Sequence, residues 1–268
     1  MGGYNFFMPI TRDSVREYYD QNTRLFLAFN RSRTAENIHR SLWTDGVTTL
    51  EQALNVTNER IRAEIEAVTS SHACIADLGC GVGAGLMYIV RRLKEPALAL
   101  GLTLSPVQAR LAGQFCRQER LEKQILFAEG DFTSVPLANG SLDAIFSVEA
   151  VVHAQEPERY FAEAGRLLRS GGKLIVVDDF QAARPLLQDE HRWLETYKNG
   201  WHVPGVSTVE RITSRADTDH LRLLKNDDLT PHLRLRALPN LVARAIRFVG
   251  NRLPIRHAIV PSMVGSMA

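Results

Sequence analysis

Cysteine is scarce in this sequence. The 268 residues include three cysteines, Cys74, Cys80 and Cys116, and the sequence has no CxxC pair and no Cys/His cluster. An odd cysteine count without paired spacing excludes a disulfide framework and the common type of structural zinc site, and it is typical of a reducing compartment. A chain of this length can bury a large enough core to fold without such crosslinks.

Long hydrophobic runs and a charge excess are also missing. The apolar runs, such as those at 97–100 and 174–177, are far shorter than the roughly 20 residues of a membrane-spanning helix. The first residues, MGGYNFFMPITRD, lack the basic and apolar regions of a secretion signal. Lysine and arginine (32) nearly balance aspartate and glutamate (30), which argues against a nucleic-acid-binding surface. We therefore expect a cytoplasmic protein with no nucleic-acid partner and no integral membrane contact.

Hydrophobic spacing divides the chain into two parts. Residues 1–70 show helical spacing, with capping oxygens at 11–14 and a second helix from Thr48–Thr49, in which Glu51 is the expected partner in a capping box. From residue 71 on, apolar runs alternate with helical stretches. The runs lie at 73–78, 98–104, 124–128, 144–148 and 174–177, and the helical stretches at 84–94, 105–119 and 157–169. This pattern predicts an α/β fold with a Rossmann-like, doubly wound and mainly parallel sheet.

The two parts define the expected domains. Residues 1–70 would form an N-terminal helical cap, and 71–268 the sheet domain, with an insertion at about 181–216 that covers the substrate. Beyond Phe180 the spacing predicts a helix containing Trp193 and Tyr197 and a turn at 200–205. It also predicts a strand at 221–224 and a helix at 238–249.

A glycine-rich segment between the first strand and the next helix is the most informative about function. It reads Ile75-Ala-Asp-Leu-Gly-Cys-Gly-Val-Gly-Ala-Gly85, a context in which backbone N–H groups bind a nucleotide-like ligand. A dinucleotide site needs an acid about twenty residues later to bind the ribose, but the corresponding position is Thr103. A sulfonium cofactor instead favours a carboxylate beside the loop, as Asp77 provides. A structural turn without a ligand is the third alternative.

Five segments resemble the class I S-adenosylmethionine-dependent methyltransferases, especially the sterol and tocopherol C-methyltransferase branch and the bacterial prenyl-diphosphate C-methyltransferases. The resemblance covers roughly residues 73–180. It rests on Asp77-Leu-Gly-Cys-Gly-Val-Gly83, Gly101-Leu-Thr-Leu-Ser-Pro-Val-Gln108, Gly130-Asp-Phe132, Ser147-Val-Glu-Ala-Val-Val-His-Ala154 and Arg166-Leu-Leu-Arg-Ser-Gly-Gly172.

This resemblance implies an S-adenosylmethionine site. The glycines would approach the methionine end of the cofactor, and Asp77 would orient its amino group. Thr103 would contact the ribose where many relatives have an acid, and Asp131 and Phe132 would contact the adenine. The complete expected set is Asp77, Gly79, Cys80, Gly81, Gly83, Thr103, Gln108, Asp131 and Phe132.

The resemblance also favours C-methylation of an isoprenoid alkene, in a prenyl diphosphate or a prenylated small molecule, through a carbocation in specialised metabolism. Such a reaction needs aromatic faces, exclusion of water and a base, for which Glu149 and His153 are the expected catalytic residues. Asp178 and Asp179 would hold Mg²⁺ against a diphosphate, helped by a basic cluster at positions 24–40. The expected substrate residues are Tyr18, Tyr19, Phe26, Arg33, His39, Trp43, Asp179, Tyr197, Trp201 and His202.

Several alternatives stay open at this stage. The enzyme could be an N- or O-methyltransferase of a small amine or phenol with His153 or His202 as base, or the chain could be a non-catalytic cofactor-binding scaffold. The aromatic residues could be core, and the basic cluster could be a solvated face. The N-terminal helices could cover their own site or exchange within a homo-oligomer. An antiparallel seventh strand, which the family usually adds, would come from 257–260 or from natural sequence beyond Ala268.

Overall fold

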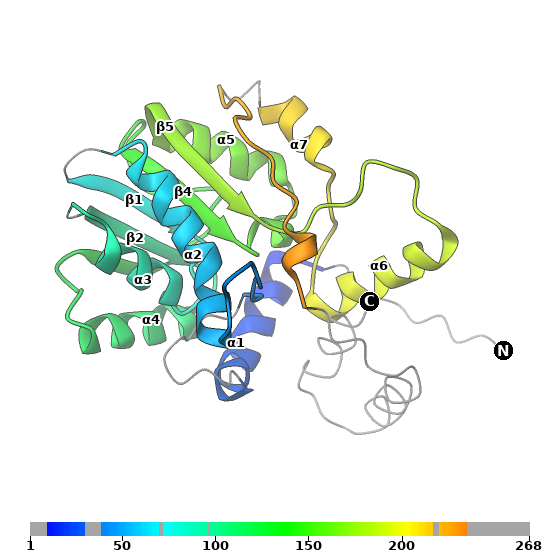
Figure 1. Ribbon diagram of the computed structural model, residues 1–268, viewed down its shortest axis with the longest axis horizontal. Helices are drawn as coiled ribbons and strands as arrows, with labels where there is room; N and C mark the ends of the chain where they lie inside the picture. Colours follow the sequence, from blue (N-terminus) through cyan, green and yellow to red (C-terminus); the bar gives the residue numbers. More distant parts are fainter. Residues whose placement is uncertain (1–9, 30–38, 70–71, 96, 217–219, 235–268) are drawn as a thin grey trace.

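The computed structural model describes residues 10–29, 39–69, 72–95, 97–216 and 220–234. The predictions for Arg33, for a helix at 238–249 and for a strand at 257–260 lie outside these residues. The described elements (Figure 1) are α1 (Arg12–Phe29), α2 (Leu50–Glu66), β1 (Ala73–Leu78), α3 (Ala84–Arg92), β2 (Ala97–Thr103), α4 (Pro106–Gln118), β3 (Ile125–Glu129), β4 (Leu142–Val148), η1 (Val151–His153), α5 (Pro157–Leu167), β5 (Leu168–Val177), α6 (Gln188–Trp201), α7 (Val209–Ala216) and η3 (Thr230–His232).

The five strands form one parallel sheet in the order β3-β2-β1-β4-β5, which confirms the predicted doubly wound α/β fold. β1 lies between β2 and β4, so the chain reverses its winding direction there. Ligands of such sheets bind in the crevice at the carboxyl ends of the strands, at this switch point. The segments after β1 and β4 are therefore the ones that the fold places at a ligand site.

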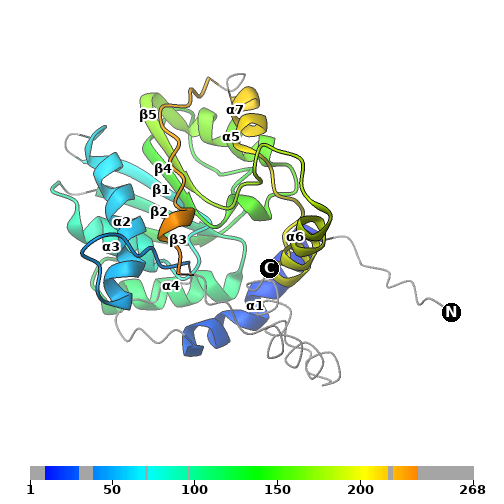
Figure 2. The same ribbon diagram turned by 45° about the vertical axis from the view of Figure 1, so that its right-hand side comes forward.

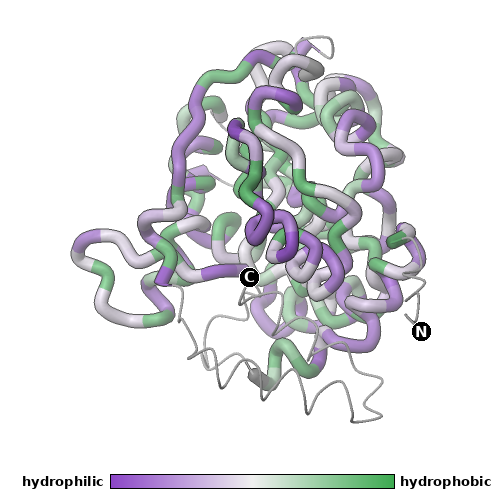
Figure 3. Tube along the Cα trace, turned by 90° about the vertical axis from the view of Figure 1, so that its right-hand side faces the viewer, coloured by the Kyte–Doolittle hydropathy of each residue, from purple (hydrophilic) through white to green (hydrophobic). Residues whose placement is uncertain are grey.

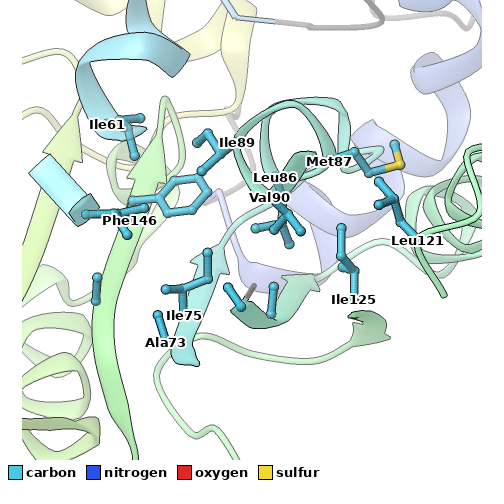
Figure 4. Packing of buried hydrophobic residues seen from close by; sticks show 14 of the residues in the cluster. Ile61, Ala73, Ile75, Leu86, Met87, Ile89, Val90, Leu121, Ile125 and Phe146 are labelled. Carbon is cyan, nitrogen blue, oxygen red and sulfur yellow. The ribbon is translucent and has the colours of Figure 1, made fainter. Parts of the chain in front are cut away.

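Helices cover both faces of the sheet (Figure 1). Because successive strand residues point to opposite faces, Ile75 packs under α2, α3 and α4, whereas Ala76 packs under α5. Figure 4 shows the first of these two clusters, in which Phe146 of β4 lies beside Ile61 of α2 and Ile89 of α3. Burial of β1 on both faces explains why its sequence, Ala-Cys-Ile-Ala-Asp-Leu, is apolar without alternation apart from Asp77.

Local capping residues set where the helices begin. The Ser105 hydroxyl accepts the Gln108 N–H and Pro106 occupies the first turn, so α4 starts where the sequence predicts. A capping box also starts α2, but its partner is Gln52 and not Glu51. The Thr49 side chain caps the helix, and the third helical residue after Thr49 is Gln52.

Two expectations for the C-terminal half are wrong. Residues 221–224 form no strand, and Leu223 and Leu224 are exposed there. A short apolar run does not become a strand without a neighbouring strand to supply hydrogen-bond partners. The predicted turn at 200–205 begins only at His202, because α6 continues through Trp201 and His202 ends it with left-handed backbone geometry.

The N-terminal helices take different positions. α2 lies on a face of the sheet against α3 and β5, while α1 packs against α4 and, through Tyr18 and Phe26, against the end of α6. Figure 2 shows α1 and α6 together beside the sheet. Hydrophobic and hydrophilic residues alternate in short stretches along the described trace (Figure 3), and none of its helices has the length and apolar character to cross a membrane.

Candidate functional site

A large cavity lies at the carboxyl edge of the sheet. Its volume is about 1720 Å³, and the segments that follow β1, β2, β3, β4 and β5 contribute to its wall, together with α1, α6 and residues 39–43. Gly79 and Glu149, which follow the two central strands, both line it. The cavity therefore occupies the position at the switch point where this fold binds ligands.

The glycine loop after β1 approaches the cavity with its backbone. The N–H groups of Gly79 and Cys80 donate to the Leu102 carbonyl oxygen at 2.8 and 2.9 Å, which fixes the loop against the end of β2. Gly81 lines the cavity, and a Cβ at this residue would meet no atom within 4 Å. The loop thus leaves open a cradle that a side chain would fill and that a ligand can approach.

Asp77 lies at the end of β1 beside this loop and is buried. Burial raises the pKa of its carboxyl group to about 8. The neighbouring Cys80 thiol is also buried, and its burial together with the nearby Asp77 carboxylate raises the pKa of the thiol well above its usual range. A cationic ligand next to Asp77 would favour the ionised carboxylate. The Asp77 carboxylate and the open space beside Gly81 fit the methionine end of S-adenosylmethionine, which carries an ammonium group and a sulfonium.

Cofactor binding is therefore expected to release a proton from Asp77. The pKa is about 8 in the free protein and lower beside a cation, so affinity should rise as the pH increases toward 8, by up to about tenfold per unit, and then level off. Calorimetric titration with S-adenosylmethionine at pH 7, in two buffers of different ionisation enthalpy, measures the released proton. Asp77→Asn should bind more weakly and release none; proton uptake by the unchanged protein would contradict the assignment.

The expected ribose and adenine contacts lie along the same edge. The Thr103 hydroxyl donates to the Gln108 side-chain oxygen at 2.7 Å, and both residues line the cavity. Asp131 accepts hydrogen bonds from the backbone and hydroxyl of Thr133 and an ion pair from Arg12. Burial alone would raise the pKa of Asp131, but these donors outweigh it and lower the pKa. Asp131 is therefore ionised at neutral pH and able to accept a hydrogen bond from an amino group.

Glu149 follows β4 with an unusual backbone. Its φ is +49°, in the left-handed region, and its N–H donates to the Val177 carbonyl oxygen at 2.8 Å. Its side-chain oxygen accepts a hydrogen bond from the backbone N–H of Arg40 at 2.9 Å. A left-handed glutamate is uncommon and costs about 1 kcal/mol or more, and such strain concentrates at functional sites. The turn thus holds a carboxylate in the cavity wall, next to the segment that precedes α2.

The two aspartates after β5, predicted as a metal pair, have different partners in the structure. Asp178 is directed at the turn after β4, where it accepts the N–H groups of Ala150 and Val152 at 3.1 and 3.0 Å. Asp179 binds the Arg40 guanidinium through both oxygens and accepts the Tyr197 hydroxyl. Both carboxylates are thereby engaged by protein donors. In the described part of the chain, no three His, Cys, Asp or Glu side chains come together as a metal site.

His153 forms a defined hydrogen-bonded chain with Tyr19. Its Nδ1 lies 3.2 Å from the His202 carbonyl oxygen, which can only accept, so Nδ1 carries the hydrogen. Nε2 therefore accepts from the Tyr19 hydroxyl, which lies 2.8 Å away. Burial lowers the pKa of His153 to about 4 and raises that of Tyr19 well above its usual range. The pair is neutral at physiological pH and presents the Tyr19 oxygen in the cavity wall.

The structure brings most of the expected substrate residues to the cavity, but not all. Those in its wall are Tyr19, His39, Trp43, Asp179, Tyr197 and Trp201. Tyr18, Phe26 and His202 instead form an aromatic cluster between α1 and the end of α6, with Tyr18 stacked on His202 at 4.6 Å. Of the expected cofactor residues, Gly79, Gly81, Thr103, Gln108, Asp131 and Phe132 line the cavity, whereas Asp77, Cys80 and Gly83 do not form part of its wall.

Sequence reasoning missed two contacts. Arg40, assigned to a phosphate-binding cluster, binds Asp179 instead, and Ser105 binds Asp20 of α1. Trp193, one of the aromatic residues expected to cover the pocket, does line the cavity from α6. The two polar contacts join segments far apart in the chain, and no local pattern encodes them.

Comparisons with known proteins agree with this geometry. Residues 76–176 match the family described as a methyltransferase domain. The chain is 30% identical over 166 residues to Methyltransferase GfsG of Streptomyces halstedii, covering 61% of this chain and 57% of that protein. It is 36% identical over 98 residues to the sterol 24-C-methyltransferase ERG6B of Gibberella zeae, covering 37% of this chain and 25% of that protein. The chain thus spans between a quarter and three-fifths of these two relatives.

A solved structure extends the likeness over nearly the whole chain. The geranyl diphosphate C-methyltransferase of Streptomyces coelicolor A3(2), in complex with Mg²⁺, geranyl diphosphate and S-adenosyl-L-homocysteine, has a TM-score of 0.69 and 14% identity. The match covers 96% of this chain and 93% of that one, and at this identity it shows a shared fold. The matched family, the parallel sheet and the glycine loop at the switch point agree with one another: residues 76–176 of this chain form a methyltransferase domain.

Proposed function

We propose that this protein is an S-adenosylmethionine-dependent C-methyltransferase that acts on an alkene of an isoprenoid small molecule. One observation carries the proposal: a single cavity joins the glycine loop to Glu149 and to the aromatic side chains of Tyr19, Trp43 and Tyr197. A cofactor-binding scaffold would have no need of a carboxylate and aromatic faces beyond the cofactor. The names of sterol and geranyl diphosphate C-methyltransferases among its similar proteins support the same chemistry.

The proposed reaction assigns a separate task to each part of the cavity. S-adenosylmethionine, when bound, supplies a methyl group on a sulfonium sulfur, and the C–S bond breaks as the alkene electron pair forms the new C–C bond. The positive charge then lies on the neighbouring acceptor carbon. Aromatic faces stabilise a cation, and an acceptor that fills the cavity would exclude water that would otherwise trap it. Glu149 takes a proton from an adjacent carbon, whose C–H electrons form the product double bond.

A second function, methylation of a hydroxyl or amine, is favoured by the Tyr19–His153 pair. The neutral imidazole is an acceptor with a fixed tautomer, so a proton from the acceptor could pass to Tyr19 as the Tyr19 proton passes to Nε2. The low pKa of His153, about 4, makes it a weak base in the free protein. The alkene reaction, which uses Glu149, therefore remains the first proposal.

Incubation with methyl-labelled S-adenosylmethionine distinguishes the two reactions. Neutral isoprenoids, prenyl diphosphates, phenols and amines serve as acceptors, each with and without Mg²⁺, and mass spectrometry locates the label. We expect label on carbon of an isoprenoid. Label only on oxygen or nitrogen would replace the first function by the second, and tight cofactor binding without methylation of any acceptor would favour a scaffold.

A further inference from the structure

The cavity is larger than one small ligand requires. Pockets that bind a single drug-sized ligand measure about 300–1,000 Å³, whereas this one measures about 1720 Å³. The glycine loop, Thr103 and Asp131 account for the half that fits the cofactor. The rest of the wall is largely apolar and includes Leu50, Leu186, Leu194, Val206 and Leu233. The acceptor half therefore has room for a large apolar molecule.

The charges in the described wall cancel. It contains five arginines, Arg12, Arg40, Arg159, Arg184 and Arg234, and five acidic residues, Asp131, Glu149, Glu156, Asp179 and Glu190. Four of the arginines form ion pairs within this set, with Asp131, Asp179, Glu156 and Glu190. The fifth, Arg234, lies over the Trp43 ring at 3.9 Å. A diphosphate would bring several negative charges to a wall whose cations already have partners, at a desolvation cost that a neutral molecule avoids.

The mouth of the cavity carries large apolar side chains that solvent reaches. Phe180, just after β5, is 37% exposed and Trp193 on α6 is 58% exposed, and both line the cavity. Leu186, seven residues before Trp193, lines it as well. The Phe180 and Trp193 rings continue the apolar wall of the cavity interior. An apolar molecule bound in the cavity would therefore contact these rings with its outer part.

From this geometry we propose that the acceptor is an uncharged apolar molecule longer than the cavity interior, and that Phe180 and Trp193 form the subsite for its outer end. The inference rests on the proposed function, since it specifies the acceptor of the same site. The mouth of the cavity is thus occupied by the outer end of the acceptor molecule whose inner end is bound in the cavity. A lipid surface is the competing occupant, and the experiment includes it.

The experiment measures binding, so that it does not depend on turnover. Equilibrium dialysis with radiolabelled geraniol, farnesol and geranylgeraniol, in the presence of S-adenosylhomocysteine, gives affinity as a function of length. Affinity should increase along the series. Trp193→Ala should weaken geranylgeraniol binding about tenfold and change geraniol binding less than about twofold. Leu187→Ala is the matched control, because Leu187 is 67% exposed beside α6 but does not line the cavity.

Three results would overturn the inference: an equal loss for short and long alcohols in Trp193→Ala, affinity that does not increase with length, or tighter binding of farnesyl diphosphate than of farnesol, with or without Mg²⁺. Sedimentation with phosphatidylcholine vesicles is the further arm. Vesicle binding lost in Trp193→Ala while alcohol affinity is unchanged would assign the mouth to a lipid surface and also overturn it. Failure of the unchanged protein to bind S-adenosylhomocysteine would contradict the proposed function instead, and the alcohols can be measured without it.

Discussion

Glu149→Gln is expected to reduce methyl transfer about 10³-fold while cofactor affinity changes less than about threefold. An amide cannot take the proton that an alkene acceptor must lose, and positioned acid–base groups contribute about 10²–10⁴ in rate. The side-chain oxygen of glutamine can still accept the hydrogen bond that the backbone N–H of Arg40 donates to Glu149 in the unchanged protein. The segment before α2 should therefore stay in place, so that the loss reflects chemistry and not a displaced wall. Single-turnover assays with labelled cofactor, together with calorimetric binding, measure the two quantities.

Glu156→Gln is the matched control for this variant. Glu156 also lines the cavity, but it is exposed and pairs with Arg159 at the rim. We expect its turnover to stay within about threefold of that of the unchanged protein, because a surface ion pair contributes little. A large loss in both variants would indicate that negative charge in the wall matters, and not proton transfer at Glu149. Loss of cofactor binding in Glu149→Gln alone would move this residue from catalysis to cofactor binding.

Gly79→Ala is expected to lower the free energy of unfolding by about 2–4 kcal/mol and to abolish measurable cofactor binding. The φ of Gly79 is +101°, and a Cβ built there lies 2.3 Å from the Ala150 Cβ. The added methyl group would push apart the glycine loop and the turn that carries Glu149. Denaturant unfolding measures the stability, and calorimetry measures the binding.

The Gly81→Ala variant distinguishes the effect of backbone strain from the effect of a steric clash between the two turns. Gly81 also has a positive φ, +54°, but its Cβ would meet no atom within 4 Å. The backbone strain alone should cost about 1 kcal/mol, while the methyl group enters the cradle and weakens cofactor binding. Equal losses of stability in the two variants would show that the contact between Gly79 and Ala150 does not limit the packing of the two turns.

The sheet could be predicted because its pattern is local. β1 is a continuous apolar run that ends in a glycine loop, and Ser105-Pro106 marks the start of α4 within two residues. The positions of the glycine loop and of Glu149 could be predicted for the same reason, since each comes directly after a strand that the pattern identifies. β5 was harder: it begins at Leu168, not near residue 174, because the glycines at 171 and 172 interrupt the apolar pattern while the strand continues.

The role of Asp178 could not be predicted. Two adjacent carboxylates suggest a metal site, but their function depends on which donors surround them. Asp178 accepts two N–H groups from the turn after β4, in which Glu149 adopts a left-handed conformation. Asp179 is paired with an arginine 139 residues away. Sequence spacing contains neither the turn geometry nor this distant pairing.

The two halves of the cavity come from different parts of the chain. The glycine loop, Thr103 and Asp131 belong to the matched domain, whereas Tyr19, Trp43 and Trp193 belong to segments outside residues 76–176. The outer segments can therefore be exchanged in the laboratory without changing the sequence of the loop proposed to hold the methyl donor. Libraries confined to the cavity-lining positions of residues 39–50 and 180–206 should yield enzymes with new acceptor preferences.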